Sequence, residues 1–329
     1  MNRVSVVVPV YNTPKEWLIP CVNSAVNQRL CNLEIVIVDD GSDESIALLC
    51  DDIARAHPGM VKTIHQENKG LSGARNTGIK SCSGDFVYLL DSDDELASET
   101  AISSMLELMS QQPDVEMVIG SFHFPGGSNA SLENEILTGQ DCLALCLEQG
   151  NGFPAQDILF SKGYLAQMDR LFVEGLVHED EEFTPRAIFG AKYVVLARNL
   201  YTYNRIEREG TITTARDEVS VFRRCRGKLI VAAEYANNPL FEWNSIPGKR
   251  NRVRAFSFAN MAFRAWANEI HSDNFQQELT KLACGVNYSS CPLLMTSAYY
   301  VRTWLCIQAF RILGIKRYLN IIRRLDRRN

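Results

Sequence analysis

The sequence has no hydrophobic run long enough to cross a membrane. The longest candidate, residues 291–310, is interrupted by Arg302, whereas a spanning helix needs about 18 consecutive apolar residues. A strand-like run begins at Arg3 and reaches Pro9, which is too early for the apolar region of a signal peptide. The pattern predicts a chain with neither a spanning helix nor a secretory leader.

Cysteine pairs and histidines with the spacing of metal ligands are also missing. None of the ten cysteines forms a C-x-x-C pair, and His57, His65, His123 and His271 show no ligand-like spacing. We therefore expect reduced thiols in a cytoplasmic protein rather than a disulfide framework. These histidines are expected to be ordinary surface or packing residues.

The formal net charge of −5 is unevenly distributed along the chain. Residues 302–329 contain eight lysines and arginines and one aspartate, so subtracting their +7 from −5 leaves −12 for residues 1–301. From residue 315, apolar positions 315, 318, 319 and 322 oppose polar positions 316, 320, 323, 324 and 327, which is typical of a basic amphipathic helix. This pattern predicts attraction of residues 302–329 to an anionic membrane leaflet, with the protein peripheral at the inner face of the cell membrane. A nucleic-acid partner is not expected, since only Tyr318 accompanies the bases and no known nucleic-acid module is visible.

The first third of the 329 residues alternates short β-branched runs with segments of helical pattern. This alternation predicts βαβ units and an α/β fold with a mostly parallel sheet flanked by helices. Thr13, Pro14 and Glu16 predict a capping box at the start of the first helix. Residues 217–267 and the tail from residue 297 have a helical pattern, with a break expected at Gly314. Strands are expected at 3–10, 33–43, 61–66, 85–91 and 115–124, and helices at 14–28, 44–55, 72–82 and 98–111.

Three aspartates follow a run of large apolar residues in "YLLDSDDEL", residues 88–96. Carboxylates this close repel one another, so Asp91, Asp93 and Asp94 need a compensating charge or a proton. A hard divalent cation is one answer, because Mg²⁺ and Mn²⁺ prefer oxygen ligands and are held by one or two carboxylates plus substrate phosphates. The alternative is a turn whose acids favour the N-terminus of the next helix, and Asp94 and Glu95 are expected to serve only that purpose.

Two further segments carry polar residues at the ends of predicted strands. In "VDDGSD", Asp39 could accept a base N–H or a ribose hydroxyl of a nucleotide, although Ser42 or Asp43 could simply cap a helix. In "NKGLSGARNTGI", the glycines permit close backbone approach and Arg75 offers a fork for planar polar groups. Neither a Walker A motif nor G-x-G-x-x-G occurs, so a metal is expected to handle a bound diphosphate.

Together these segments resemble the family 2 glycosyltransferases, a large group with the GT-A fold. The resemblance covers about residues 3–214, with all blocks in family order. It implies a GT-A domain over residues 1–214 and leaves residues 215–329 as a helical C-terminal region. The matching blocks are "VSVVVPVYN", "LEIVIVDDGSD", "ENKGLSGARNTGI", "FVYLLDSDD", "HEDEEFTPRAIFGAKYV" and "YTYNRIEREGTIT".

The resemblance implies metal-dependent, inverting transfer of a sugar from a nucleotide-sugar donor, with UDP favoured, to a glycan or lipid-linked acceptor in bacterial cell-surface polysaccharide synthesis. By this resemblance Asp39 looks like the acid that reads the base, with Pro9 and Tyr11 beside it. Arg75 looks like the arginine that lines the nucleotide pocket. The D-x-D aspartates match Asp91, toward the ribose, and Asp93, toward a Mn²⁺ or Mg²⁺ ion.

The last two blocks supply a candidate base and a candidate lid. Asp180 in "HED" matches the catalytic base, and Arg208 is similar to a residue that closes over the diphosphate. The acids Glu179, Glu181 and Glu182 are expected to be solvated or to favour a helix N-terminus, which is also the structural alternative for Asp180. His178 departs from the aromatic residue of many relatives and is expected to pack. The structural alternative for Arg208 is a surface loop after an edge strand.

Two other functions fit parts of the pattern. A catalytically silent relative could hold a nucleotide or glycan within an assembly complex, although the presence of every expected acid argues against it. A nucleotidyltransferase would share the α/β core but should have a glycine-rich, basic loop after the first strand. That place is taken here by "PVYNTPKEW", which contains no glycine.

Overall fold

The computed structural model describes residues 2–30, 32–121, 134–149, 152–206, 215–237, 246–288 and 298–326. The chain divides into two compact units. Unit 1 comprises Met1–Gly175 and Phe183–Glu207, and unit 2 comprises Leu176–Glu182 and Arg208–Asn329. The expected boundary at residue 214 lies outside the described residues, so the division into 1–214 and 215–329 stays a prediction.

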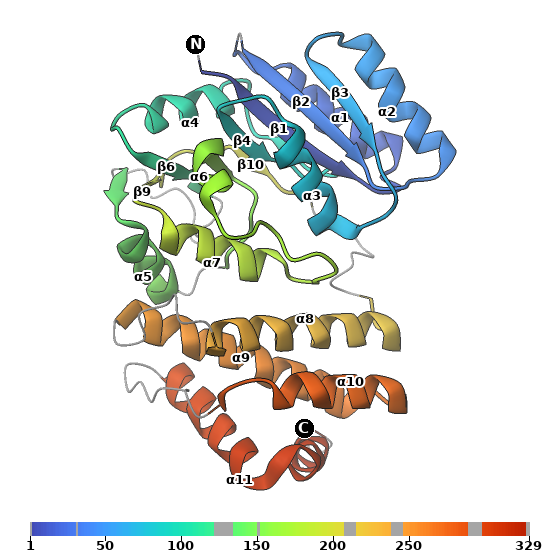
Figure 1. The fold of residues 1–329 in the computed structure, drawn as a ribbon, viewed down its shortest axis with the longest axis vertical. Coiled ribbons are helices and arrows are strands. Elements are labelled where there is room, and N and C mark those ends of the chain that lie inside the picture. Colours follow the sequence, from blue (N-terminus) through green and yellow to red (C-terminus); the bar gives the residue numbers. More distant parts are fainter. Residues whose placement is uncertain are drawn as a thin grey trace. The chain divides into compact units, whose positions relative to one another are not determined.

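Unit 1 is built on a large sheet whose strands are β1 (Val4–Val10), β2 (Leu33–Asp39), β3 (Val61–His65), β4 (Phe86–Leu89), β6 (Val115–Ile119), β7 (Glu135–Leu137), β8 (Ile158–Ser161) and β9 (Tyr193–Leu196). The strand order is β3-β2-β1-β4-β8-β6-β9-β7 (Figure 1). The pairs β3–β2, β2–β1, β1–β4 and β6–β9 are parallel, whereas β8 pairs antiparallel with β4 and β6, and β7 with β9. The expected mostly parallel α/β sheet is confirmed.

Alternate residues of the central strands point to opposite faces of the sheet, so each face has its own apolar layer. Helices α1 (Lys15–Val26), α2 (Glu44–Ala56) and α4 (Ala101–Met109) contribute to one layer, which contains Val6 of β1, Ile35 of β2 and Leu18 of α1. These side chains are fully buried, and full burial of such an aliphatic side chain stabilises the fold by about 1.5–3 kcal/mol.

Helix α3 (Gly70–Ser81) packs against β1 and β2. At Gly78, helix α3 and the sheet come so close that an added Cβ would lie 2.2 Å from Val7 Cγ1 and 3.3 Å from Val38 Cγ2. Gly78 is therefore required by the distance between this helix and the sheet. The remaining helices assigned wholly or partly to unit 1 are α5 (Gly139–Gln149), α6 (Lys162–Gln167) and α7 (Asp180–Gly190).

The expected capping box at the first helix does not form. Helix α1 begins at Lys15, and its N-cap, Pro14, makes no side-chain cap hydrogen bond. The hydroxyl of Thr13 is instead hydrogen-bonded to that of Ser92 at 2.7 Å, and both residues are buried. The prediction was wrong because a partner distant in the sequence occupies the hydroxyl that a local pattern assigns to the helix.

Unit 2 consists mainly of the helices α8 (Glu218–Asn237), α9 (Ile246–Glu269), α10 (Asp273–Cys284) and α11 (Ala298–Asp326). They share a core centred on aromatic rings. The ring of Phe263 stacks on Phe310 with centroids 4.7 Å apart and meets the edge of Tyr318 at 5.8 Å. The expected helical C-terminal region is confirmed.

Helix α11 is interrupted at Gly314, whose φ of 69° and ψ of 166° are not helical. The break lies where the sequence predicts it. Beyond it, Tyr318, Leu319 and Ile322 are buried in the core of unit 2. The apolar side of the expected amphipathic helix is therefore internal, and the surface of this segment is formed by other residues.

Two findings for the described part of the chain concern features that the sequence lacks. None of its helices is long and apolar enough to cross a bilayer. Its eight cysteines are free thiols, at positions 21, 50, 82, 142, 146, 225, 284 and 306.

Candidate functional site

The sequence-predicted residues of unit 1 gather at one edge of the sheet. Strands β2, β1 and β4 are neighbours and run parallel, so their carboxyl ends lie at the same edge. Asp39 ends β2, Tyr11 directly follows β1, and Asp91 lies two residues beyond β4. A ligand in an open α/β sheet is expected at this edge.

Asp39 is held by two protein donors. Its carboxylate accepts hydrogen bonds from the backbone N–H of Ser42, at 3.0 Å, and from His65 Nδ1, at 2.8 Å. The other ring nitrogen of His65 lies 2.9 Å from Asp51 Oδ1. Hydrogen bonds to Asp51 and Asp39 raise the pKa of His65, since each stabilises the imidazolium. Asp39 is only 3% exposed, but a carboxylate has about four lone-pair sites and can accept a further bond.

His65 is an exposed residue, as expected, but its contacts with Asp39 and Asp51 were not predicted from the sequence. It ends β3, which is the neighbour of β2 in the sheet, and its place opposite Asp39 follows from their register. The rule that polar residues at neighbouring strand ends meet could have found it.

The loops that follow β1 and β2 are tied together. Asn12 donates its backbone N–H to the Ser42 hydroxyl at 2.9 Å, and its side-chain oxygen accepts the N–H of Asp43 at 2.7 Å. Asn12 has a φ of 49°, a left-handed conformation that asparagine tolerates better than most residues. Asp40 fixes the loop before α3, because its Oδ1 accepts bonds from Gln66 Nε2 and from the N–H of Lys69.

Asp91 and Arg75 form a buried ion pair. Arg75 is 0% exposed, and its Nη2 lies 2.7 Å from Asp91 Oδ1. Its guanidinium also lies over the ring of Phe172, 5.3 Å from the centroid. The other oxygen of Asp91 accepts a hydrogen bond from Gln156 Nε2. The charge that compensates Asp91 is therefore an arginine of the protein, and the carboxylate is fixed in orientation from both sides.

Asp94 anchors a second segment to the same turn. Its two oxygens accept bonds from the Tyr203 hydroxyl at 2.5 Å and from the N–H of Ile206 at 2.9 Å. A short antiparallel pair, β5 (Glu95–Leu96) with β10 (Tyr203–Asn204), continues this contact. Burial raises the pKa of Asp94, although its bonds to Tyr203 and Ile206 act in the opposite direction. The sequence assigned Asp94 only to a helix start, whereas it connects residues 203–206 to the turn.

Asp93 lies partly exposed in this turn, between the buried Ser92 and Asp94. The described residues contain no group of three or more His, Cys, Asp or Glu side chains arranged to hold a metal ion. A cation at Asp93 would therefore take further oxygen ligands from a bound diphosphate and from water. This donor set fits Mg²⁺ or Mn²⁺, which bind through one or two carboxylates together with substrate phosphates.

Two predicted base contacts differ in exposure. Pro9 is buried within β1, opposite Val38 of β2. Tyr11 is 57% exposed and offers its ring to solvent beyond the end of β1. Arg208, the predicted lid residue, lies outside the described residues.

The predicted base, Asp180, is the first residue of α7 and belongs to unit 2. Its Oδ1 accepts a hydrogen bond from the N–H of Glu181 at 2.8 Å. Within unit 2, Glu181 is paired with Arg254 of α9, and the backbone oxygen of Glu182 accepts the Tyr235 hydroxyl of α8 at 2.6 Å. Glu181 and Glu182 are thus attached to the helices of unit 2 rather than solvated, and both lie in the first turn of α7, as the helix alternative expects.

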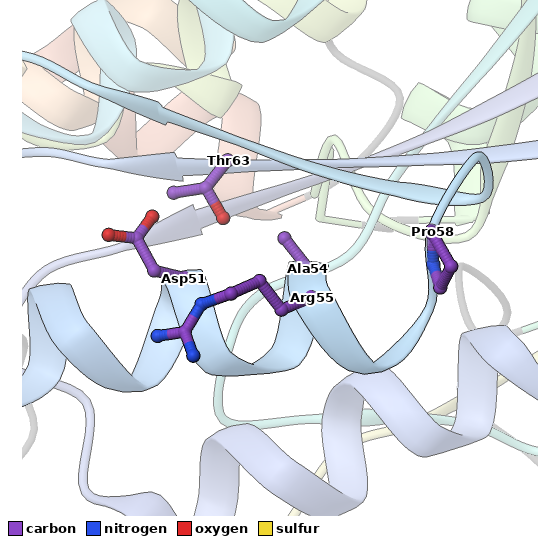
Figure 2. A pocket seen from close by; sticks show the side chains of 5 residues that line it. All are labelled: Asp51, Ala54, Arg55, Pro58 and Thr63. Carbon is purple, nitrogen blue, oxygen red and sulfur yellow. The ribbon is translucent and has the colours of Figure 1, made fainter.

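A hollow of about 600 Å³ lies between α2 and β3, lined by Asp51, Ala54, Arg55, Pro58 and Thr63 (Figure 2). It contains none of the sequence-predicted residues. Its one connection to them is Asp51, which reaches Asp39 through His65. We assign no ligand to it.

Comparison with known proteins identifies the family. The model of glycosyl transferase family 2 matches residues 5–160. Glycosyltransferase GlyG of Streptococcus pneumoniae serotype 4 is 32% identical over 241 residues, which cover 67% of this chain and 78% of that protein. Two other curated relatives are matched over only 17% and 34% of their own lengths.

Solved structures agree on the fold. Residues 1–349 of S. aureus TarS, crystallised with UDP-GlcNAc, superpose with a TM-score of 0.63 at 19% identity, over 95% of this chain and 92% of that one. The mannosyltransferase PcManGT of Pyrobaculum calidifontis, in complex with GDP-Man and Mn²⁺, gives a TM-score of 0.54 at 17% identity, over 99% of this chain and 88% of that one. The match of the family model to residues 5–160 and the relation to GlyG lead to one conclusion: the chain belongs to glycosyl transferase family 2 and is a glycosyltransferase.

Proposed function

We propose that this glycosyltransferase moves a sugar from a UDP-sugar to a hydroxyl of a glycan or lipid-linked acceptor, with inversion, during cell-surface polysaccharide synthesis. The observation that carries the proposal is the gathering of Asp39, Asp91 and Asp93 at neighbouring strand ends. The UDP-GlcNAc complex of TarS, a protein of the same fold, supports the choice of donor.

Each residue of the proposed donor site has a role that follows from its contacts. Asp39, held by His65 and Ser42, accepts an N–H of the base, and the exposed ring of Tyr11 packs beside the base together with Pro9. Asp91, oriented by Arg75 and Gln156, accepts a ribose hydroxyl. Arg75 lines the pocket mainly by fixing Asp91, because it is fully buried. Arg208, which lies outside the described residues, is assigned to the diphosphate by the family resemblance alone.

Asp93 would hold a Mn²⁺ or Mg²⁺ ion, a choice supported by the Mn²⁺ complex of PcManGT. When bound, such an ion offsets the negative charge that develops on a departing nucleoside diphosphate.

Asp180 acts as the general base. It takes the proton of the acceptor hydroxyl while the bond from that oxygen to the anomeric carbon forms and the bond from the anomeric carbon to the phosphate oxygen breaks. The nucleoside diphosphate leaves with the bonding electron pair. Because a single base opposite the leaving group gives one displacement, the configuration at the anomeric carbon inverts. General base catalysis of this kind contributes about 10²–10⁴-fold.

The surface of α11 supports peripheral attachment at the cytoplasmic face of the membrane. After the break at Gly314, four exposed residues recur on one side of the helix, at intervals of four, three and one residues: Arg317, Ile321, Arg324 and Leu325. Basic and apolar side chains alternating on one exposed helix face are suited to an anionic leaflet.

Calorimetry and a turnover assay on two variants test the proposal. In the presence of Mn²⁺, Asp93→Ala is expected to bind the UDP-sugar no more tightly than the wild type binds it when EDTA has removed the metal. Asp180→Ala is expected to bind the donor as the wild type does but to transfer sugar about 10²–10⁴-fold more slowly. The control is Asp52→Ala, which removes an exposed carboxylate on α2. Equal transfer rates for Asp180→Ala and wild type would contradict the assigned base, and binding without turnover in the wild type would contradict the transferase reaction itself.

A further inference from the structure

The segment Leu176–Glu182 belongs to unit 2, where it contacts helix α8. A Cβ added to Gly227 of α8 would lie 2.1 Å from the backbone oxygen of Val177, so only glycine allows the helix to come this close. The Tyr235 hydroxyl fixes the other end of the segment through the backbone oxygen of Glu182. These two contacts hold His178 and Asp180 against α8.

Positive side chains surround His178 in this arrangement. Arg224 and Lys228 precede and follow Gly227 on α8, and both act on the His178 ring. Burial, followed by the charges of Lys228 and Arg224, lowers the pKa of His178 to about 4. The backbone at His178 is left-handed, with a φ of 70°, a conformation that histidine, like asparagine and aspartate, adopts more often than other non-glycine residues.

Two of these groups lack a partner among the described residues. His178 Nε2 is buried and makes no hydrogen bond. Lys228 is half-buried and makes no ion pair within 4 Å. Burial, followed by the charge of Arg224, lowers the pKa of Lys228, although Cys225 and Glu269 act in the opposite direction. A half-buried ammonium beside a second cation is unfavourable unless an anion accompanies it.

We propose that His178, Arg224 and Lys228 form a subsite for a phosphate group of the acceptor. This deepens the proposed function and rests on it, because the acceptor is assigned through Asp180, two residues from His178. Three nitrogen donors from two elements match the several acceptor oxygens of a phosphate. The other source of the same chemistry is the diphosphate of the donor. We assign the subsite to the acceptor because its segment carries the residue that takes the acceptor proton.

Side-chain NMR of the full-length protein, labelled with ¹⁵N at histidine, tests the proposal. His178 is assigned with His178→Gln, and the probes are sn-glycerol 3-phosphate, inorganic phosphate, UDP and glycerol at constant ionic strength. We expect saturable shifts of the His178 ring signals with both phosphates and none with glycerol. The pKa of His178 should rise when phosphate is bound, because an anion favours the imidazolium.

Variants of α8 provide the second readout. Lys228→Gln and Arg224→Gln should each weaken glycerol phosphate binding about tenfold or more, whereas Lys281→Gln, the same charge change at an exposed position of α10, should not. A response to UDP alone would overturn the acceptor assignment and give the subsite to the donor. The absence of any saturable phosphate response in the wild type would overturn the subsite altogether. Calorimetry with UDP-sugar is independent of this result, so the proposed function and the subsite can fail separately.

Discussion

Asp39 and Asp91 show that protein cations act on the clustered acids before any ligand is bound. Asp91 is paired with Arg75, and Asp39 with the His65 ring. The sequence argument that such carboxylates require a compensating charge was sound, but it assigned the whole compensation to a metal ion. Under the proposed function a cation would be held at Asp93 together with oxygens of the diphosphate.

The pair of His65 with Asp39 and Asp51 makes stability depend on pH. Hydrogen bonds to the two carboxylates raise the pKa of His65 in the folded chain, so its contribution is fully present below the unfolded value of about 6.5 and is lost as the pH rises through the folded value. His65→Gln should therefore lower the urea midpoint more at pH 6 than at pH 9. The loss of unfolding free energy caused by His65→Gln should differ between pH 6 and pH 9 by about 1 kcal/mol or less. The difference is small because the His65 side chain is 43% exposed.

The matched control for this experiment is His271→Gln, an exposed histidine that makes its hydrogen bonds through the backbone, with its N–H donating to Glu218 and its oxygen accepting from Gln276. Its effect on the midpoint should change less over the same pH range than that of His65→Gln. A His65→Gln effect that grows toward pH 9 would contradict the assigned ion pairs.

The motifs identified the acids but not the residues that orient them. Gln156 lies 65 residues after Asp91 in the chain, and no local pattern connects the two. Only the insertion of β8 beside β4 brings its neighbourhood to the site. Tyr203 likewise meets Asp94 from a distance of 109 residues.

At the scale of elements, the spacing between α3 and the sheet is set by one missing side chain. A methyl group at Gly78 would collide with Val7, in the middle of β1. Gly78→Ala should lower the free energy of unfolding by about 1–3 kcal/mol, the usual cost of overpacking a close-packed core. Urea denaturation followed by circular dichroism measures it.

Gly163→Ala in α6 is the matched control, because the nearest atom to its added Cβ is 3.7 Å away. It should be neutral or stabilise the chain by up to about 1 kcal/mol, as expected for alanine in place of glycine in a helix. Equal effects of the two substitutions would show that Gly78 is not limited by packing.

Elements with strong local patterns were predicted well, and those created by pairing were not. The strands β1, β2 and β3 have continuous β-branched runs, and their bounds lie close to the expected ranges. Strands β8 and β10 have four and two residues, too few for a period to be visible. Strand β8 forms because it pairs with β4 and β6, and β10 forms because it pairs with β5.

At the scale of the whole molecule, the chain forms two units with separate hydrophobic cores. Sequence motifs occur almost entirely in unit 1, so the function of unit 2 could not be predicted from them. Its terminal helix was predicted to be amphipathic. The apolar side chains Tyr318, Leu319 and Ile322 are in the core of unit 2 and do not form an exposed face. A helical pattern indicates that one face of a helix is apolar, but it does not indicate whether that face packs against the protein or against a membrane.

Sedimentation with lipid vesicles tests the exposed face of α11. The protein should bind vesicles containing phosphatidylglycerol more tightly than neutral vesicles. Each basic residue near an anionic surface contributes about 1 kcal/mol, so Arg317→Gln combined with Arg324→Gln should weaken binding on the order of 30-fold at low salt. The double variant Arg55→Gln with Lys80→Gln, two exposed basic residues of unit 1, is the control. Equal binding to neutral and anionic vesicles would exclude this attachment.

The assignment of Leu176–Glu182 to unit 2 limits how such enzymes can be recombined. A hybrid that joins residues 1–207 to the helices of a relative would keep the native loop around Asp180 but lose its supports, Gly227, Tyr235 and Arg254. A working chimera must therefore transplant this internal heptapeptide together with the C-terminal helices. Under the proposed function, acceptor preference then depends on two separate segments of the sequence, residues 176–182 and the C-terminal helices.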